Sequence, residues 1–261
     1  MRSKRCAIRG GNLQGPSIDA YDAPERVRRY DADMDVMHPL RHEMIRVALD
    51  ILPFDADDSI RALELGTGTG VLARALVDRF PRAKLVAVDG SREMLDVARE
   101  RLKDAVDRVE WVVSDFLRLP EKLVADATYD VVLSSYALHH LESDEKLHVV
   151  SRVIAALVPG GWFVNADLIA SASPLCERRF QELRIDGILS RAPAGDARFT
   201  DGESTRRFLD ELEARERDRP QVLDDDLRTF RSAGLATVEI VWKELREVVV
   251  AGTKPVPRGS S

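Results

Sequence analysis

The stretch that decides the fold runs from Ile60 to Val71 and reads Ile60-Arg-Ala-Leu-Glu64-Leu-Gly66-Thr-Gly68-Thr-Gly70-Val71. Its opening apolar run stops at Gly66, which predicts a buried strand, and the residues that follow predict a helix. Glycines between a strand and a helix let the backbone turn tightly and let a ligand approach the main chain. The loop therefore predicts a ligand-binding turn, although a plain strand-to-helix turn would carry the same glycines.

The spacing of these glycines indicates which ligand the loop would hold. The pattern is G-x-G-x-G rather than the G-x-G-x-x-G of dinucleotide-binding folds, and Glu64 stands in the strand just before it. A carboxylate beside a pyrophosphate would be repelled, whereas it suits a cationic ligand. The loop therefore favours S-adenosylmethionine, which carries a sulfonium and an ammonium group, over a nicotinamide dinucleotide.

The chain on either side of the loop alternates between short apolar runs and helical patterns. Predicted strands cover 60–65, 84–88, 109–113, 129–134 and 162–167, and predicted helices cover 71–80, 91–103 and 144–157. Strands joined by helical crossovers run parallel, with helices on both faces of the sheet. The core is therefore predicted to be α/β, with a doubly wound, mostly parallel sheet.

The alternation breaks after the fifth strand. Residues 171–219 hold two helical stretches, near 174–190 and 202–216, without a strand between them. We interpret this segment as a helical cap inserted into the fold.

The chain then closes with a helix at about 221–233 and two strands, Thr237–Trp242 and Leu245–Gly252. Only Lys243 and Glu244 separate these strands, which is the spacing of a hairpin. The last strand is therefore expected to run antiparallel.

These patterns divide the chain into consecutive regions. The expected regions are a disordered segment at 1–20, an N-terminal helical lid at 21–58, a cofactor-binding core at 59–170, the helical cap at 171–219, a closing helix and hairpin at 220–254, and a tail at 255–261 that resembles a tag scar.

Composition and net charge exclude several classes of function. Lys and Arg number 39 and Asp and Glu 45, so a net charge of −6 offers no global attraction for nucleic acid or for an anionic membrane. Cys6 and Cys176 cannot form a disulfide framework, and the basic N-terminus has no apolar signal region. We therefore expect a cytoplasmic protein with no membrane segment; its oligomeric state stays open.

Acidic residues follow two further strands. Asp89 ends the second strand, where a carboxylate can accept hydrogen bonds from both ribose hydroxyls, although acids also favour helix starts. Asp115 and Phe116 follow the third strand and suit an adenine, although a loop acid and a core Phe would look the same.

Several motifs in this order resemble the class I S-adenosylmethionine-dependent methyltransferases. The motifs are LELGTGTG, VAVDGSREMLDVARERL, SDF, YDVVLSSYALHHL and LVPGGWFVNADL, with a weaker echo in EIVWKELREVVVAGTKP. The resemblance covers about residues 60–168. It implies a Rossmann-like seven-stranded sheet of order 3-2-1-4-5-7-6 with strand 7 antiparallel.

The resemblance also implies roles for matching residues. The amino-acid part of the cofactor would be surrounded by Glu64, Gly66, Thr67, Gly68 and Gly70, and its methionine portion would pass Ser134 and Ser135. The ribose would be bound by Asp89, and the border of ribose and adenine by Gly90, Ser91 and Met94. The adenine would be bound by Ser114, Asp115 and Phe116. Because the N-terminal segment of this family often closes over the cofactor, Tyr30 and Arg41 are further candidate contacts.

The chemistry expected from the resemblance is in-line displacement at the methyl carbon of a sulfonium. A general base is needed only when the acceptor atom carries a weakly acidic proton. His139, His140 and Tyr136 are candidates at the end of the fourth strand, and Asp167 ends the fifth, but each could equally be structural. No catalytic residue is assigned from the sequence.

Two other groups of polar residues have no settled role. His38 and His42 have i, i+4 spacing but no third metal ligand, so no metal site is expected and we treat them as surface or lid residues. Arg178, Arg179, Arg184 and Arg191 in the cap favour an anionic acceptor, or they form a solvated face with the acidic residues among them.

The sequence favours a methyltransferase acting on a small molecule, with the acceptor and the methylated atom undetermined. One alternative is a methyltransferase of nucleic acid or protein, which the absence of a basic stripe and the Ser134-Ser-Tyr-Ala137 tetrad oppose. Another is a non-catalytic cofactor-binding or regulatory module. A third is a nicotinamide-dependent oxidoreductase, which the loop spacing and Glu64 oppose.

Overall fold

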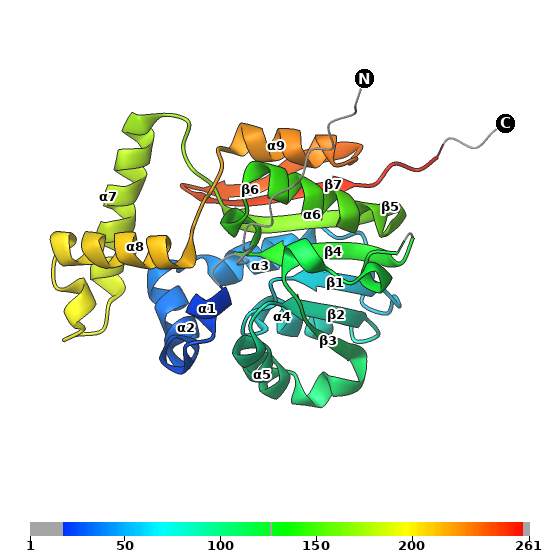
Figure 1. The fold of residues 1–261 in the computed structure, drawn as a ribbon, viewed down its shortest axis with the longest axis horizontal. Coiled ribbons are helices and arrows are strands. Elements are labelled where there is room, and N and C mark those ends of the chain that lie inside the picture. Colours follow the sequence, from blue (N-terminus) through cyan, green and yellow to red (C-terminus); the bar gives the residue numbers. More distant parts are fainter. Residues whose placement is uncertain (1–17, 126, 258–261) are drawn as a thin grey trace, which may run out of the picture.

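A seven-stranded sheet of order β3-β2-β1-β4-β5-β7-β6 forms the centre of this computed structural model, which describes residues 18–125 and 127–257 (Figure 1). Its strands are β1 (Arg61–Leu65), β2 (Lys84–Asp89), β3 (Val109–Val113), β4 (Tyr129–Ser135), β5 (Leu157–Leu168), β6 (Thr237–Glu244) and β7 (Glu247–Thr253). Strands β1 to β5 pair in parallel, and β7 runs antiparallel to both β5 and β6. The predicted fold class is confirmed, including the antiparallel last strand.

Helices cover both faces of the sheet. On one face lie α3 (Arg41–Asp50), α4 (Val71–Arg79) and α5 (Arg92–Arg101), and on the other α6 (Ser143–Ala155) and α9 (Leu223–Ser232) (Figure 1). Along β1, Ala62 belongs to the core under α3 and α4, whereas Leu63 belongs to the core under α6 and α9. Successive side chains of a strand point to opposite faces, so a strand buried on both sides is mostly apolar, and Glu64 is the buried exception in β1.

The N-terminal segment is helical from Ile18. It forms α1 (Ile18–Tyr21) and α2 (Pro24–Met37), so the expectation of disorder is wrong for residues 18–20, while residues 1–17 lie outside the described residues. In α2 the mostly polar sequence buries Val27 and Met34 on one side. Such sparse apolar positions suffice because α2 packs against α7 and α5 as well as the core.

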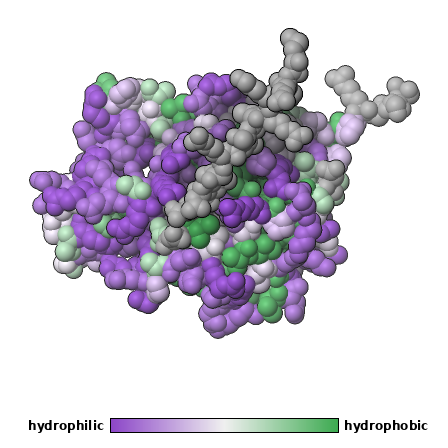
Figure 2. Space-filling view, viewed as in Figure 1, coloured by the Kyte–Doolittle hydropathy of each residue, from purple (hydrophilic) through white to green (hydrophobic). Residues whose placement is uncertain are grey.

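The cap has a small core of its own. It consists of α7 (Pro174–Arg191) and α8 (Gly202–Glu216), close to the predicted stretches. Figure 1 shows both helices at one end of the sheet, on the same side as α1 and α2. Their apolar residues, with Met37 of α2, form a separate cluster, and the cap side seen in Figure 2 is largely hydrophilic. The cap is therefore tied to the lid as well as to the sheet.

The closing hairpin turns two residues later than predicted. Lys243 pairs with Val248 and Glu244 with Glu247, so the turn consists of Leu245 and Arg246. The register shifts between Ile240 and Trp242, which offsets the alternation on which the prediction rested.

Candidate active site

The glycine loop between β1 and α4 follows a path that excludes side chains at one point. Gly66 has φ +75°, and a Cβ there would lie 2.3 Å from the Cβ of Ala137, in the loop after β4. The backbone N–H groups of Gly66 and Thr67 donate to the carbonyl of Val88, at 2.9 and 3.1 Å. The loop is thus held between the ends of β2 and β4.

Asp89, the last residue of β2, fastens this loop to the start of α5. Its Oδ2 accepts a hydrogen bond from the Gly68 N–H at 2.7 Å, and its Oδ1 accepts one from the Ser91 N–H at 2.8 Å. Ser91 in turn caps α5, because its Oγ accepts from the Met94 N–H at 3.1 Å. Each carboxylate oxygen of Asp89 keeps a further lone pair for a ligand.

Glu64 is a buried acid at the floor of the site. Its side chain lines the crevice beside the loop, and among the described residues its Oε2 has no hydrogen-bond partner. Burial raises the pKa of Glu64 to about 8, and the nearby charge of Asp89 adds to this effect. An unpartnered buried carboxyl that ionises only with difficulty is suited to a cationic ligand.

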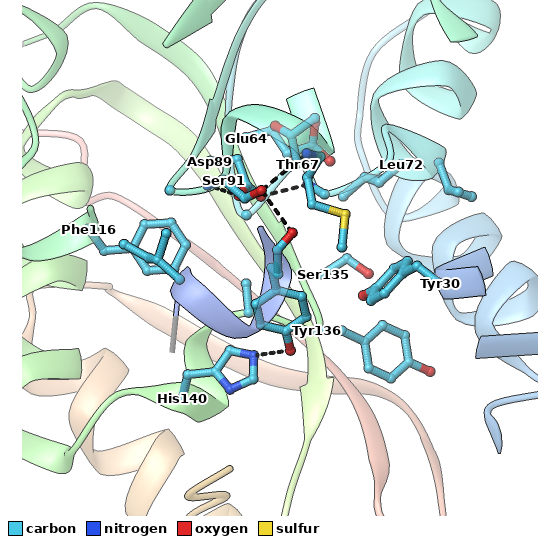
Figure 3. A pocket seen from close by; sticks show the side chains of 18 of the residues that line it. Tyr30, Glu64, Thr67, Leu72, Asp89, Ser91, Phe116, Ser135, Tyr136 and His140 are labelled. Atoms are coloured by element: carbon cyan, nitrogen blue, oxygen red, sulfur yellow. Dashed lines mark hydrogen bonds between the residues drawn. The ribbon is translucent and has the colours of Figure 1, made fainter. Parts of the chain in front are cut away.

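The crevice gathers side chains and backbone from β1, β2, β3 and β4 at their carboxyl ends (Figure 3). Of the residues predicted to hold the cofactor, it is lined by Glu64, Gly66, Thr67, Gly68, Asp89, Gly90, Ser91, Met94, Ser114, Asp115, Phe116 and Ser135. Tyr30, Arg41, Tyr136 and His140 line it too. Ligands of open α/β sheets bind at this edge, next to the point where strand order reverses.

Two predicted cofactor contacts lie outside the lining. Gly70 caps α4 with φ +81°, and a Cβ there would lie 2.9 Å from the Cβ of Ala98 in α5, so this glycine serves helix packing. The Ser134 hydroxyl is buried and donates to the carbonyl of Leu65 at 3.0 Å. The alternation of β4 points Ser134 inward and Ser135 to the crevice.

The sequence missed the residues that the first helix brings to the crevice. Ile18 and Tyr21 of α1 line it, and the Ile18 Cδ1 lies 2.7 Å from where a Cβ of Gly90 would be. The Tyr21 hydroxyl lies 3.2 Å from His140 Nε2, joining the lid to the loop after β4. The aromatic ring of Tyr21 in a polar segment was the one signal that could have indicated this.

A buried chain of polar groups stands behind His140. His140 Nδ1 lies 3.1 Å from Asp218 Oδ1, which in turn lies 3.5 Å from His139 Nε2. His139 Nδ1 lies 2.5 Å from Asp167 Oδ1, at the end of β5. Asp218 follows α8 in the cap and was not predicted. The chain thus joins β5, the loop after β4 and the cap behind the crevice.

The charges among these buried polar residues shift the pKa values of the two histidines in opposite directions. Burial lowers the pKa of His139, but the carboxylates of Asp167 and Asp218 outweigh it and raise the pKa to about 10. Burial lowers the pKa of His140, and the charge on His139 lowers it further. At neutral pH we therefore assign a charged His139 and a neutral His140, whose Nδ1 proton faces Asp218 and whose Nε2 accepts from the Tyr21 hydroxyl.

The buried polar residues behind His140 have the spacing of metal ligands, whereas His38 and His42 do not. Ligand atoms of His139, His140 and Asp218 lie within 4.8 Å of one another. A charged His139 already lies between the carboxylates of Asp167 and Asp218. His38 is buried, with Nδ1 2.8 Å from Glu247 Oε1, which leaves the lid and not the surface as its place, whereas His42 is exposed.

Sheet order and crevice together define the class of protein. A sheet of order 3-2-1-4-5-7-6 with an antiparallel seventh strand and a carboxylate-flanked glycine loop after β1 defines a class I methyltransferase domain. Residues 62–161 match the model of the methyltransferase domain family. The core of the chain is therefore similar to the methyltransferase domains of class I.

Curated relatives share the core of the chain. It is 31% identical over 133 residues to a malonyl-[acyl-carrier protein] O-methyltransferase of Halalkalibacterium halodurans, covering 51% of this chain and 48% of that protein. It is 33% identical over 138 residues to a trans-aconitate 2-methyltransferase of Variovorax paradoxus, covering 53% and 46%. The chain thus spans about half the length of the curated relatives it matches.

A solved structure extends the likeness of fold beyond the core. An O-methyltransferase family protein from Burkholderia thailandensis superposes with a TM-score of 0.65 at 18% identity, over 94% of this chain and 65% of that one. Among the described residues, no helix is both long and apolar enough to cross a membrane.

Proposed function

We propose that the protein transfers a methyl group from S-adenosylmethionine to a small-molecule acceptor. The observation that carries the proposal is the pairing of Glu64 and Asp89 beside the glycine loop. The names of two relatives, which refer to a malonyl thioester and to trans-aconitate, support an acceptor of low mass or a small acyl group. The cytoplasmic location and the residue roles below are part of the same proposal.

The residues present fit the methyl donor. The unpartnered Glu64 carboxyl would face the ammonium group, Asp89 the ribose hydroxyls, and Asp115 with Phe116 the adenine. When bound, S-adenosylmethionine supplies a methyl group on a positively charged sulfur, ready for displacement by a nucleophile. The chain's own task is to orient the acceptor and to exclude water.

His140 is the side chain best placed to take a proton from the acceptor. It lines the crevice, is neutral at pH 7, and presents Nε2 at the surface that Tyr21 covers. Asp218 holds the opposite ring nitrogen. Tyr136 is unsuited to this role, because burial and Glu247 raise the pKa of its hydroxyl, which donates to Glu247 at 2.9 Å.

Turnover with a panel of metabolites tests the proposal and its alternatives. We expect S-adenosylhomocysteine to form with at least one small acceptor and not with tRNA, DNA or histone substrates. Donor binding without turnover on any acceptor would favour the non-catalytic module, and binding of a nicotinamide dinucleotide in place of the donor would refute the proposal.

We expect affinity for S-adenosylmethionine to rise about tenfold between pH 6 and pH 7. The free protein holds a proton on Glu64, whose pKa is about 8, and a bound cation would expel it, so binding becomes easier as pH rises toward 8. Calorimetry at the two pH values measures the slope. In Glu64→Gln, where nothing can ionise, the slope should vanish; a slope that persists would place the linked proton elsewhere.

A further inference from the structure

A second cavity lies across one buried partition from the crevice. It has a volume of about 280 Å³ and lies between α7, the start of α3 and the β6–β7 turn. The partition consists of Tyr136, His38 and Glu247. Tyr136 lines the crevice, whereas His38 and Glu247 line the cavity. Glu247 Oε1 lies 2.9 Å from the Tyr136 hydroxyl and 2.8 Å from His38 Nδ1.

The backbone at the partition is strained. Tyr136 has φ +49°, a left-handed conformation that bulky residues rarely adopt. Its ring lies 5.0 Å from that of His38, centroid to centroid. Such strain persists only where the surroundings fix it, and it is common at ligand-binding sites.

The walls of the cavity combine apolar side chains with charged ones, which include Glu244, Arg246 and Glu247 at the β6–β7 turn. Leu40, Leu168, Phe180 and Leu183 contribute apolar surface, and Arg184 and Arg191 of α7 contribute charge. Arg178 and Arg179, on the same helix, are exposed and lie outside this lining. The arginines of the cap therefore divide into a pair outside the cavity and a pair that lines it, of which Arg191 is also exposed to solvent.

The cavity-lining pair has unused hydrogen-bonding capacity. Among residues 18–125 and 127–257, no carboxylate forms an ion pair with Arg191, whose Nε donates to the Val36 carbonyl at 3.0 Å. Arg184 donates to Glu213 through Nη1, but its buried Nε has no partner in the part of the chain that the structure describes. Two guanidinium groups with free donors can bind a carboxylate.

A glycine makes room for one of these groups. Gly187 lies inside α7, where glycine costs about 1 kcal/mol relative to alanine. A Cβ there would lie 2.9 Å from Arg191 Nη1 and 3.1 Å from Nη2. The guanidinium thus rests on the bare backbone of the helix, at the wall of the cavity.

We infer that this cavity is a second ligand site, separate from the crevice, for a small molecule with an apolar body and a carboxylate, the carboxylate at Arg184 and Arg191 and the other end toward Tyr136. The inference does not depend on the proposed methyl transfer, because Tyr136, His38 and Glu247 lie between the cavity and the crevice. Glu247 at the partition carries negative charge, which turns the anionic end of the ligand away from the crevice.

Octanoate is the probe, with octan-1-ol as its uncharged counterpart. Calorimetry on the full chain should show octanoate binding at least about tenfold more tightly than octanol, since a hydrogen bond to a charged group contributes roughly 1.5 to 3 kcal/mol. Arg191→Gln should weaken the binding of octanoate by about tenfold and leave the affinity for S-adenosylmethionine unchanged. The same change at exposed Arg179 is the matched control and should have no effect.

Gly187→Ala keeps the test independent of folding. Alanine strengthens the helix, and the added Cβ displaces only the flexible end of Arg191, so the variant should unfold at a higher temperature yet bind octanoate more weakly. Equal binding of octanol, unchanged octanoate binding in Arg191→Gln, or mutual exclusion of octanoate and S-adenosylmethionine would each overturn the inference. Loss of donor binding in the wild type, with octanoate binding intact, would instead refute the proposed function.

Discussion

His140→Gln is expected to lower kcat by about 100-fold and to leave the affinity for S-adenosylmethionine unchanged. Proton transfer by a positioned side chain contributes at least this much when the acceptor atom must lose a proton. Gln keeps a similar size and can still contact the Tyr21 hydroxyl, so the change removes basicity with little loss of packing. The measurement is steady-state turnover, with calorimetry for the donor.

The matched control is the same substitution at His148, which is exposed on α6. This variant should retain wild-type turnover. Equal kcat in His140→Gln and wild type would show that the acceptor needs no base or that another group serves. Because His140 must be neutral to accept a proton, and its pKa lies below the ordinary 6.5, activity should fall only as pH drops below that value.

Asp218 is a positioning residue, and a change at this residue should shift the pH dependence of kcat. Its carboxylate raises the pKa of His140, against the larger effects of burial and of the charge on His139. Asp218→Asn should therefore move the acid limb of kcat to lower pH while reducing the maximum. A merely structural role would lower the maximum without moving the limb.

Asp89→Ala is expected to weaken S-adenosylmethionine binding by about 100-fold or more. Two hydrogen bonds from ribose hydroxyls to a carboxylate contribute roughly 1.5 to 3 kcal/mol each, and every 1.4 kcal/mol is a factor of ten in affinity. The sequence alone suggests little cost in folding. The structure indicates a moderate one, because the variant leaves the N–H groups of Gly68 and Ser91 without their acceptor.

Asp89→Asn separates the two effects. It keeps one carbonyl oxygen for a backbone donor and should fold better than Asp89→Ala, yet it cannot accept from both hydroxyls and should still bind the donor poorly. Asp96→Ala, at an exposed acid on α5, is the control. Wild-type affinity in a folded Asp89→Ala variant would rule out the ribose contact.

The core was predictable because its signals are local. The apolar runs from β1 to β5, the turn at Gly66 and the acid at Asp89 each report on a few consecutive residues. A parallel sheet brings the carboxyl ends of its strands to one edge, so residues placed there in sequence meet in space. Gly70 and Ser134 lie outside the crevice lining, because a shift of one or two positions turns a residue from the crevice to the packing.

The sequence by itself determined the sheet, the edge at which the crevice lies and most of the residues that line it, since these follow from period and spacing. Only the tertiary structure decided which side chains from distant segments gather around His140. Tyr21 reaches His140 across 119 positions, and Asp218 reaches it from the cap. Contacts between distant segments depend on how helices pack on one another, and no periodic pattern in one segment carries the position of the other.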